Sequence, residues 1–223
     1  MSKFSKAIVL PAPWRGDRKI QSVSKWHCTG HAVRGDGAGA CMQGESKLEM
    51  DHQAIQFATP DVADVIEQVR FYYGWDNEKE HTFDMLLTKT SGVRVACTVK
   101  PTARLASGKF VEHMQVVAWW VQKKKFASAV RLLTEADIDP ITLHNANLNA
   151  AVRDKDPDAE AAVRAVACKL HGAISIKTLT DEVGLKDCGY RAILRMLSKR
   201  ELQAVHHEQT TPQTLITWKG PQS

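Results

Sequence analysis

The stretch that decides the fold is TFDMLLTKTSGVRVACTVK, residues 82–100. Two β-rich runs, 82–88 and 93–99, stand on either side of a Thr-Ser-Gly turn. Runs of this kind, separated by a turn that contains glycine, predict a β-hairpin. Asp84 would lie inside its first strand and Lys100 would end its second, so strand pairing brings these two side chains near one another.

The segments around this hairpin alternate between helical and extended patterns. In chain order we expect a short helix over 46–57, a strand toward the end of 62–73, a charged turn over 74–80, a helix over 110–125, a strand over 129–134, and a loop with a short helix over 135–149. Residues 1–40 show no sustained period and are expected to form an arm or extended segment. This order predicts an α/β fold with a mixed sheet flanked by helices.

A second unit is expected after the polar run DKDPD, which has the composition of a linker. Helical patterns cover 158–170, 175–183 and 187–199, and β-like runs cover 202–207 and 215–218. Ser175 is placed to cap the second of these helices and Gly184 to end it. Three helices and a hairpin are the plan of a winged helix-turn-helix. We therefore predict a basic arm over 1–28, a mixed-sheet domain over 29–153 and a winged-helix domain over 154–223.

Composition narrows the class of protein. Hydrophobic residues make up 43% of the 223, enough for a packed core. No apolar run approaches the roughly 20 residues that span a bilayer, and the N-terminal region lacks the apolar core of a signal peptide. The five cysteines are odd in number and scattered. They favour reduced thiols in a cytoplasm over a disulfide framework, so we expect a cytoplasmic protein without a membrane partner.

The net charge of +5 is unevenly distributed. Residues 1–40 carry seven Lys and Arg against two Asp and Glu, residues 41–154 carry 13 against 15, and residues 155–223 carry 10 against eight. Basic ends are compatible with phosphate contacts, and an acidic middle suits a site that collects carboxylates for a metal. An ordinary solvated surface explains the same distribution, so charge alone leaves both interpretations open.

Glu49, Asp84 and Lys100 form a candidate site for metal-dependent cleavage of a phosphodiester. Glu49, from the earlier helix, would supply the second carboxylate. Magnesium prefers such hard oxygen ligands and keeps waters that can attack phosphate. Lys100 would hold the attacking water or neutralise charge on the phosphate in the transition state. Spacing alone does not distinguish this site from an unrelated Asp and Lys on neighbouring strands.

Five motifs in chain order resemble those of the TnsA-type transposon endonucleases. GESKLE at 44–49 resembles the family's (E)SxLE, and PDV at 60–62 with EQV at 67–69 resembles its dPdV…eQP segment. HTFD at 81–84 is similar to HTPD, TVKP at 98–101 to EVKP, and TEADI at 134–138 to the TE.DI that follows the last core strand. The predicted C-terminal winged helix resembles that family's second domain. No single motif is specific, but their order over residues 29–218 supports the resemblance.

The resemblance implies a restriction-endonuclease-like fold of the PD-(D/E)xK superfamily. It also implies DNA cleavage with Mg²⁺, or with Mn²⁺ as a substitute. By the same resemblance, Glu49 and Asp84 bind the metal and Lys100 is the catalytic lysine. Two positions depart from the family: Phe83 replaces the proline of HTPD, and Thr98 replaces the Glu or Gln of EVKP.

Thr98 puts catalysis in question, because a threonine hydroxyl is a weak metal ligand beside a carboxylate. Glu112, on the following predicted helix, is the candidate for a migrated carboxylate.

Two hypotheses about function follow. The first is a TnsA-like endonuclease that acts in transposition, phage or other mobile-element DNA processing, with a transposase or phage protein as its partner. The second is a catalytically inactive protein of the same fold that binds DNA as a regulator or recombination accessory factor. Palindromic DNA sites would favour a homodimer in either case.

Five cations accompany the third C-terminal helix: Lys186, Arg191, Arg195, Lys199 and Arg200. Arg191 and Arg195 are four residues apart and therefore share a face. In a winged helix this element enters the major groove, where arginine binds phosphate or guanine. A winged helix that docks another protein is the alternative.

A cluster of soft ligands, WHCTGH at 26–31 with Cys41 downstream, raises the question of structural zinc. Its spacing matches no standard zinc site, and zinc is therefore not expected.

Overall fold

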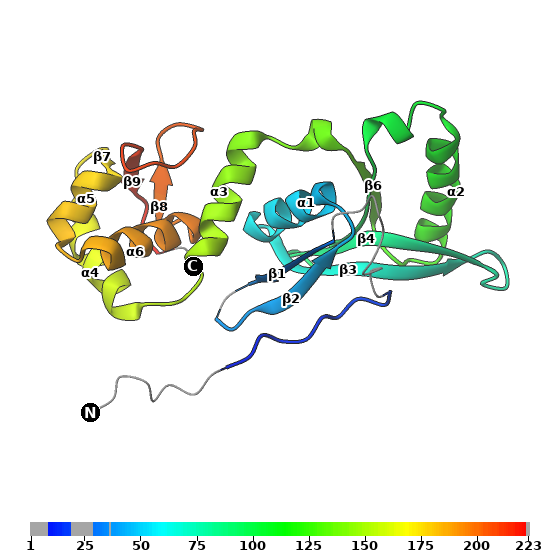
Figure 1. Ribbon diagram of the computed structural model, residues 1–223, viewed down its shortest axis with the longest axis horizontal. Coiled ribbons are helices and arrows are strands. Elements are labelled where there is room, and N and C mark those ends of the chain that lie inside the picture. The colour runs from blue at the N-terminus through cyan, green and yellow to red at the C-terminus, as the bar shows by residue number, and fades with distance from the viewer. Residues whose placement is uncertain (1–8, 19–28, 36, 222–223) are drawn as a thin grey trace.

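The computed structural model describes residues 9–18, 29–35 and 37–221. Its central element is a four-stranded mixed sheet with strand order β3-β4-β5-β6. The strands are β3 (Val62–Tyr73), β4 (Lys79–Lys89), β5 (Arg94–Val99) and β6 (Ala129–Leu133). The first three pair antiparallel and β6 pairs parallel to β5. A parallel neighbour needs a crossover, and α2 (Lys109–Lys123) provides it (Figure 1).

Two apolar clusters fill the space around this sheet. The α1-side cluster is centred on Val65 and Met85 and packs against Leu48 of α1 (Lys47–Ala58). A small antiparallel hairpin, β1 (Gly30–Arg34) with β2 (Ala40–Gly44), contributes Met42 to it. The α2-side cluster contains Phe83 and the buried side chains of α2. Two short 3₁₀ helices, Thr102–Arg104 and Glu135–Asp137, follow β5 and β6 respectively.

Side-chain alternation along the two longest strands changes near their middle. Val65 and Met85 join the α1-side cluster, whereas Val69 and Phe83 join the α2-side cluster. In a regular strand, residues separated by an even number of positions face the same side. The register pairs Glu67 with Met85 and Val69 with Phe83, so the change falls at one level of both strands. Between these two pairs lie Gln68 and Asp84, which are polar and belong to neither apolar cluster.

The C-terminal part packs around a separate cluster, formed by residues such as Val163, Ile176, Leu179 and Ile193. Its elements are α4 (Pro157–Ala167), β7 (Ile174–Ser175), α5 (Ile176–Val183), α6 (Lys186–Ser198), β8 (Leu202–Ala204) and β9 (Leu215–Trp218). The three strands form a sheet with order β7-β9-β8. Helix α3 (Pro140–Ala151) contacts both α1 and α6, and Figure 1 shows it standing between the central sheet and the C-terminal helices.

Most predicted elements are present, and the expected α/β class with a mixed sheet is confirmed. The hairpin at 82–99 forms as β4 and β5, and Ser46 and Ser175 cap their helices through their side chains. The expectation of an arm over all of residues 1–40 was wrong in part, because β1 and the start of β2 lie there. Among the described residues, no helix is long and apolar enough to cross a membrane.

Candidate functional site

Glu49 is held at the first turn of α1. Ser46 is the N-cap, and its hydroxyl accepts a hydrogen bond from the Glu49 amide at 3.2 Å. The Glu49 carboxylate in turn accepts bonds from the Glu45 amide at 3.0 Å and from the Ser46 hydroxyl at 3.0 Å. A Ser followed three residues later by Glu is a helix-start signature of its own. The motif at 44–49 therefore has a local structural role as well as the role that the resemblance implies.

Asp84 lies on β4 with only 5% of its surface exposed. Its Oδ2 accepts a hydrogen bond of 2.7 Å from the backbone amide of Val99, at the end of β5. The hairpin thereby fixes the carboxylate. Its second oxygen, Oδ1, faces the side chain of Gln68 on β3 at 3.5 Å.

Gln68 joins the two carboxylates. It falls opposite Asp84 where the side-chain alternation changes, is fully buried, and has a φ of 52° that non-glycine residues adopt infrequently. Its Nε2 lies 3.4 Å from Glu49 Oε2 and 3.5 Å from Asp84 Oδ1. Both carboxylates therefore face one point, and a group with partial positive charge occupies it. Gln68 belongs to the quoted EQV motif, but sequence reasoning gave it no role.

A basic residue of the N-terminal segment covers this point from outside. Arg18 donates to Gln68 Oε1 through Nη2 at 2.6 Å and through Nε at 3.1 Å. It also forms an ion pair of 2.8 Å with Glu45. The backbone amides of Asp17 and Arg18 donate to the Gln68 carbonyl. The end of the described segment 9–18 therefore lies against β3, the edge strand of the sheet, at the level of the carboxylates.

Burial raises the pKa of both carboxyl groups. The pKa of Glu49 is raised to about 7, because burial and then the negative charge of Asp84 disfavour its ionised form. Burial also raises the pKa of Asp84, although the charge of Lys100 and the Val99 amide oppose that rise. Two neighbouring carboxylates that resist ionisation gain most from a bound cation.

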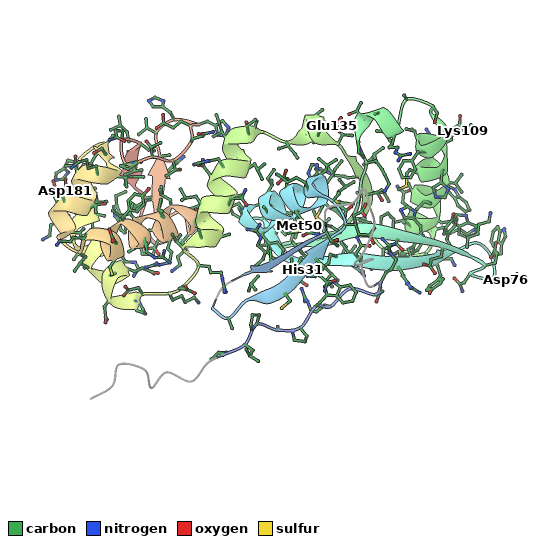
Figure 2. All side chains as sticks on the ribbon, in the orientation of Figure 1. His31, Met50, Asp76, Lys109, Glu135 and Asp181 are labelled. Atoms are coloured by element: carbon green, nitrogen blue, oxygen red, sulfur yellow. The ribbon has the colours of Figure 1, made fainter. Side chains whose placement is uncertain are left out.

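Lys100 follows β5 and is half-buried beside this pair. Its charge acts on Asp84, and its Nζ lies 5.8 Å from the centre of the Phe110 ring on α2. The loop after it is tied down by Glu135, which accepts the Thr102 amide with both carboxylate oxygens. Figure 2 shows Glu135 on the segment that follows β6. This contact provides a structural reason for the glutamate in the TEADI motif.

Thr98 is 1% exposed, and its hydroxyl lies 3.1 Å from Nε2 of His81. The His81 ring is also 5.7 Å from the ring of His113 on α2. Burial, then the charges of His113 and Lys100, lower the pKa of His81 to about 4. Thr98, which replaces the usual acid or amide of the motif, is therefore hydrogen-bonded to the neutral imidazole of His81.

Glu112 does not join the carboxylates in this arrangement. It lies exposed in the first turn of α2, whose Phe110 and His113 are the residues that approach Lys100 and His81. Over the ranges that the structure describes, no group of three or more His, Cys, Asp and Glu side chains is arranged to hold a metal ion. The central grouping contains two carboxylates and one amide instead.

The C-terminal cations do not form one exposed row. Arg195 is 5% exposed and bonds Glu160, and Arg191 reaches the carbonyl of Ala151. The expectation that Arg195 presents its guanidinium to a DNA groove is therefore corrected: α6 turns this residue inward to satisfy a buried acid. Lys186, Lys199 and Arg200 lie exposed at the two ends of the helix.

Residues 26–28 of the soft-ligand cluster, Cys28 among them, lie outside the described residues. Cys41 lies on β2 as a free, half-buried thiol.

No protein-family model matches this chain, and a search of curated proteins finds no match either. The relationship to the TnsA-type endonucleases therefore stays a prediction that rests on the motifs.

Proposed function

We propose that this protein is a TnsA-like, metal-dependent DNA endonuclease. The observation that carries the proposal is the meeting of Glu49 and Asp84 at Gln68 Nε2, 3.4 and 3.5 Å away, with Lys100 beside them. These three charged residues come from a helix, a strand and a strand end that lie far apart in the sequence. They are the residues that the resemblance assigns to the metal and to the catalytic lysine.

The topology supports the same proposal. A mixed sheet with α1 and α2 on its two clusters is compatible with a restriction-endonuclease-like domain. The order helix, short strand, helix, helix, hairpin after residue 157, with sheet order β7-β9-β8, supports a winged helix. Such a domain would place the nuclease on DNA or dock a transposase or phage protein. A homodimer on palindromic DNA belongs to the same proposal.

The donor set fits a magnesium ion. Glu49 and Asp84 offer hard carboxylate oxygens, and rotation of the Gln68 amide would present a third oxygen. A bound divalent ion would activate water and neutralise charge on the scissile phosphate. Lys100 would stabilise that charge from the β5 side. For that rotation Arg18, which donates to Gln68 Oε1, would have to release this oxygen.

A second candidate function is DNA binding without cleavage. The hydrogen bond between Thr98 and His81 favours this function, because the hydroxyl at the position of the usual acid or amide is bonded to a neutral imidazole. The exposed placement of Glu112 removes the expected substitute carboxylate from the immediate site. The protein would then act as a regulator or recombination accessory factor on the same scaffold.

Cleavage of supercoiled plasmid in Mg²⁺ and in Mn²⁺ tests the first function. We expect nicking by the wild type, and a loss of at least about 100-fold in Asp84→Asn and in Lys100→Met. The first substitution weakens the metal site, and the second removes the positive charge that would stabilise the reacting phosphate. Asp76→Asn, an exposed carboxylate in the β3–β4 turn, is the matched control and should cut normally. Glu112→Gln should also cut normally.

Two results would redirect the proposal. Absence of cleavage in both metals, together with a gel shift of DNA by the wild type, would establish the binding function instead. Cleavage that survives Asp84→Asn would contradict the assigned site and point to a contaminating nuclease.

A further inference from the structure

A cavity of about 110 Å³ lies between α1, α3 and α6, at the junction of the central sheet and the C-terminal part. Figure 1 shows these three helices meeting there. A volume of roughly 10–15 Å³ by this measure holds one water, so the cavity has room for a small polyatomic ion. This cavity is separate from the carboxylate site, because neither Glu49 nor Asp84 lines it.

The lining of this cavity is strongly basic. Among the residues that the structure describes, five cations and no Asp or Glu contribute to it: Arg34, Arg153, Lys155, Arg195 and Lys199. The remaining lining consists of small or apolar residues such as Ala54 and Ala146, together with the neutral polar groups of Asn149 and Ser198. A concentration of cations in a partly enclosed, low-dielectric space attracts an anion.

Arg195 gives an independent sign of a missing partner. Its side chain is 6% exposed, its Nε donates to Glu160 at 2.8 Å, and its Nη1 lies 3.5 Å from the Val152 carbonyl. Its Nη2 is buried, and no hydrogen-bond partner for that atom is found in the part of the chain that the structure describes. Buried polar groups are nearly always paired, so the guanidinium of Arg195, a lining residue of the cavity, is short of one acceptor.

Glu160 does not neutralise the positive charge of the cavity lining. It lies behind the cavity and is shared by Arg195, by Lys199 at 2.7 Å and by Arg164 at 3.4 Å. Arg195 and Lys199 therefore bring two positive charges to the lining against one carboxylate, which Arg164 also shares. Arg34 donates to the side-chain oxygen of Asn147 at 3.4 Å and also interacts with the charge of Asp51, whereas Arg153 donates to the Gly37 carbonyl at 2.7 Å.

We propose that this cavity binds a phosphate monoester dianion. Arginine forks match the oxygens of phosphate with paired hydrogen bonds, and a dianion suits the excess of cations. Free phosphate, a small phosphorylated molecule and the phosphorylated end of a DNA strand share this chemistry. The site stands whether or not the pair of Glu49 and Asp84 cleaves DNA.

The test is calorimetric titration of the full chain with inorganic phosphate, against chloride at matched ionic strength. We expect saturable binding, weakened at least about tenfold by Arg153→Gln and further by the double variant Arg34→Gln/Arg153→Gln, because each removes a charged hydrogen bond. Arg131→Gln, an exposed arginine on β6 outside the cavity, is the matched control and should bind as the wild type does. Both cavity variants keep the Arg195–Glu160 pair, so that loss of binding would not reflect loss of that contact.

A second arm identifies the source of the phosphate. A preference for duplex DNA with 5′-phosphates over the same duplex with 5′-hydroxyls, abolished in the double variant, would support a DNA end as the ligand. Phosphate binding without that preference would support a small phosphorylated ligand. Absence of phosphate binding, or binding that the double variant leaves unchanged, would overturn the proposal, and the latter would indicate an adventitious ion only.

Discussion

At the scale of single residues, Glu49 makes the stability of the protein depend on pH. Its pKa is raised from 4.5 to about 7 by burial and by Asp84, so ionising it in the folded protein costs free energy. The stability that protonated Glu49 contributes is fully present below its unfolded pKa and is lost as the pH rises through about 7. Between about pH 5 and pH 8 we expect the free energy of unfolding of the wild type to fall by up to about 3 kcal/mol relative to Glu49→Gln. Urea denaturation at several pH values measures this difference.

Two additions sharpen that measurement. Glu112→Gln alters an exposed carboxyl and should reproduce the pH curve of the wild type. Magnesium at high pH should restore stability in the wild type more than in Glu49→Gln, because an ion that binds only the folded state stabilises it. A flat difference between wild type and Glu49→Gln across the range would show that the folded pKa of Glu49 is not raised.

At the scale of elements, α4 and α6 are joined by a buried ion group. Glu160 pairs with Arg195 on α6, and both side chains are 6% exposed. Removing one partner from such a group leaves a buried charge without compensation. We expect Glu160→Gln to lower the free energy of unfolding by about 3 kcal/mol. The exposed helical pair of Asp181 with Lys177 is the control, and Asp181→Asn should cost less than about 0.5 kcal/mol.

The pH dependence of this pair has the opposite sign to that of Glu49. Burial acts to raise the pKa of Glu160, but the hydrogen bonds and charges of Lys199 and Arg195 outweigh it, and the pKa is lowered. The stability that Glu160 contributes is therefore present above its unfolded pKa and is lost as the pH falls through the folded value. The gap between wild type and Glu160→Gln should close in acid, and a gap that widens there would refute the assignment.

At the scale of the whole molecule, the C-terminal core begins before the predicted linker. Val152 is 4% exposed within that cluster, and its carbonyl lies near Arg195. Asn145 of α3 also bonds the carbonyl of Glu208 and the amide of Thr210. We expect a fragment of residues 139–223 to unfold cooperatively and at a higher midpoint than a fragment of residues 154–223. Thermal unfolding followed by circular dichroism compares the two.

A substitution in the full chain separates packing from length. Val152→Ala should lower the free energy of unfolding by about 2 kcal/mol, because it removes buried methyl groups and leaves a cavity. Equal midpoints for the two fragments would instead support a boundary at residue 154.

Local features of the fold were predictable from the sequence. Helix starts at Ser46 and Ser175 and the hairpin of β4 and β5 depend on side-chain caps, turns and periodicity within a few residues. The β1–β2 hairpin was missed, because its short strands are half-buried and their glycine-rich connection carries no clear alternation. In the candidate site, Glu49, Asp84 and Lys100 were named in advance, whereas Gln68 and Arg18 were not. A polar residue in the middle of the apolar run 62–73 was the available signal for Gln68.

The sequence by itself determined the order of elements, the caps and the motifs, because these follow from hydrogen bonds and apolar periods between near neighbours. Only the tertiary structure decided which polar groups meet. It turned Arg195 inward to Glu160, set Glu112 apart from the carboxylates, and brought Gln68 between Glu49 and Asp84. The free energy of such contacts depends on burial and on partners far away in the chain, and no local pattern records either.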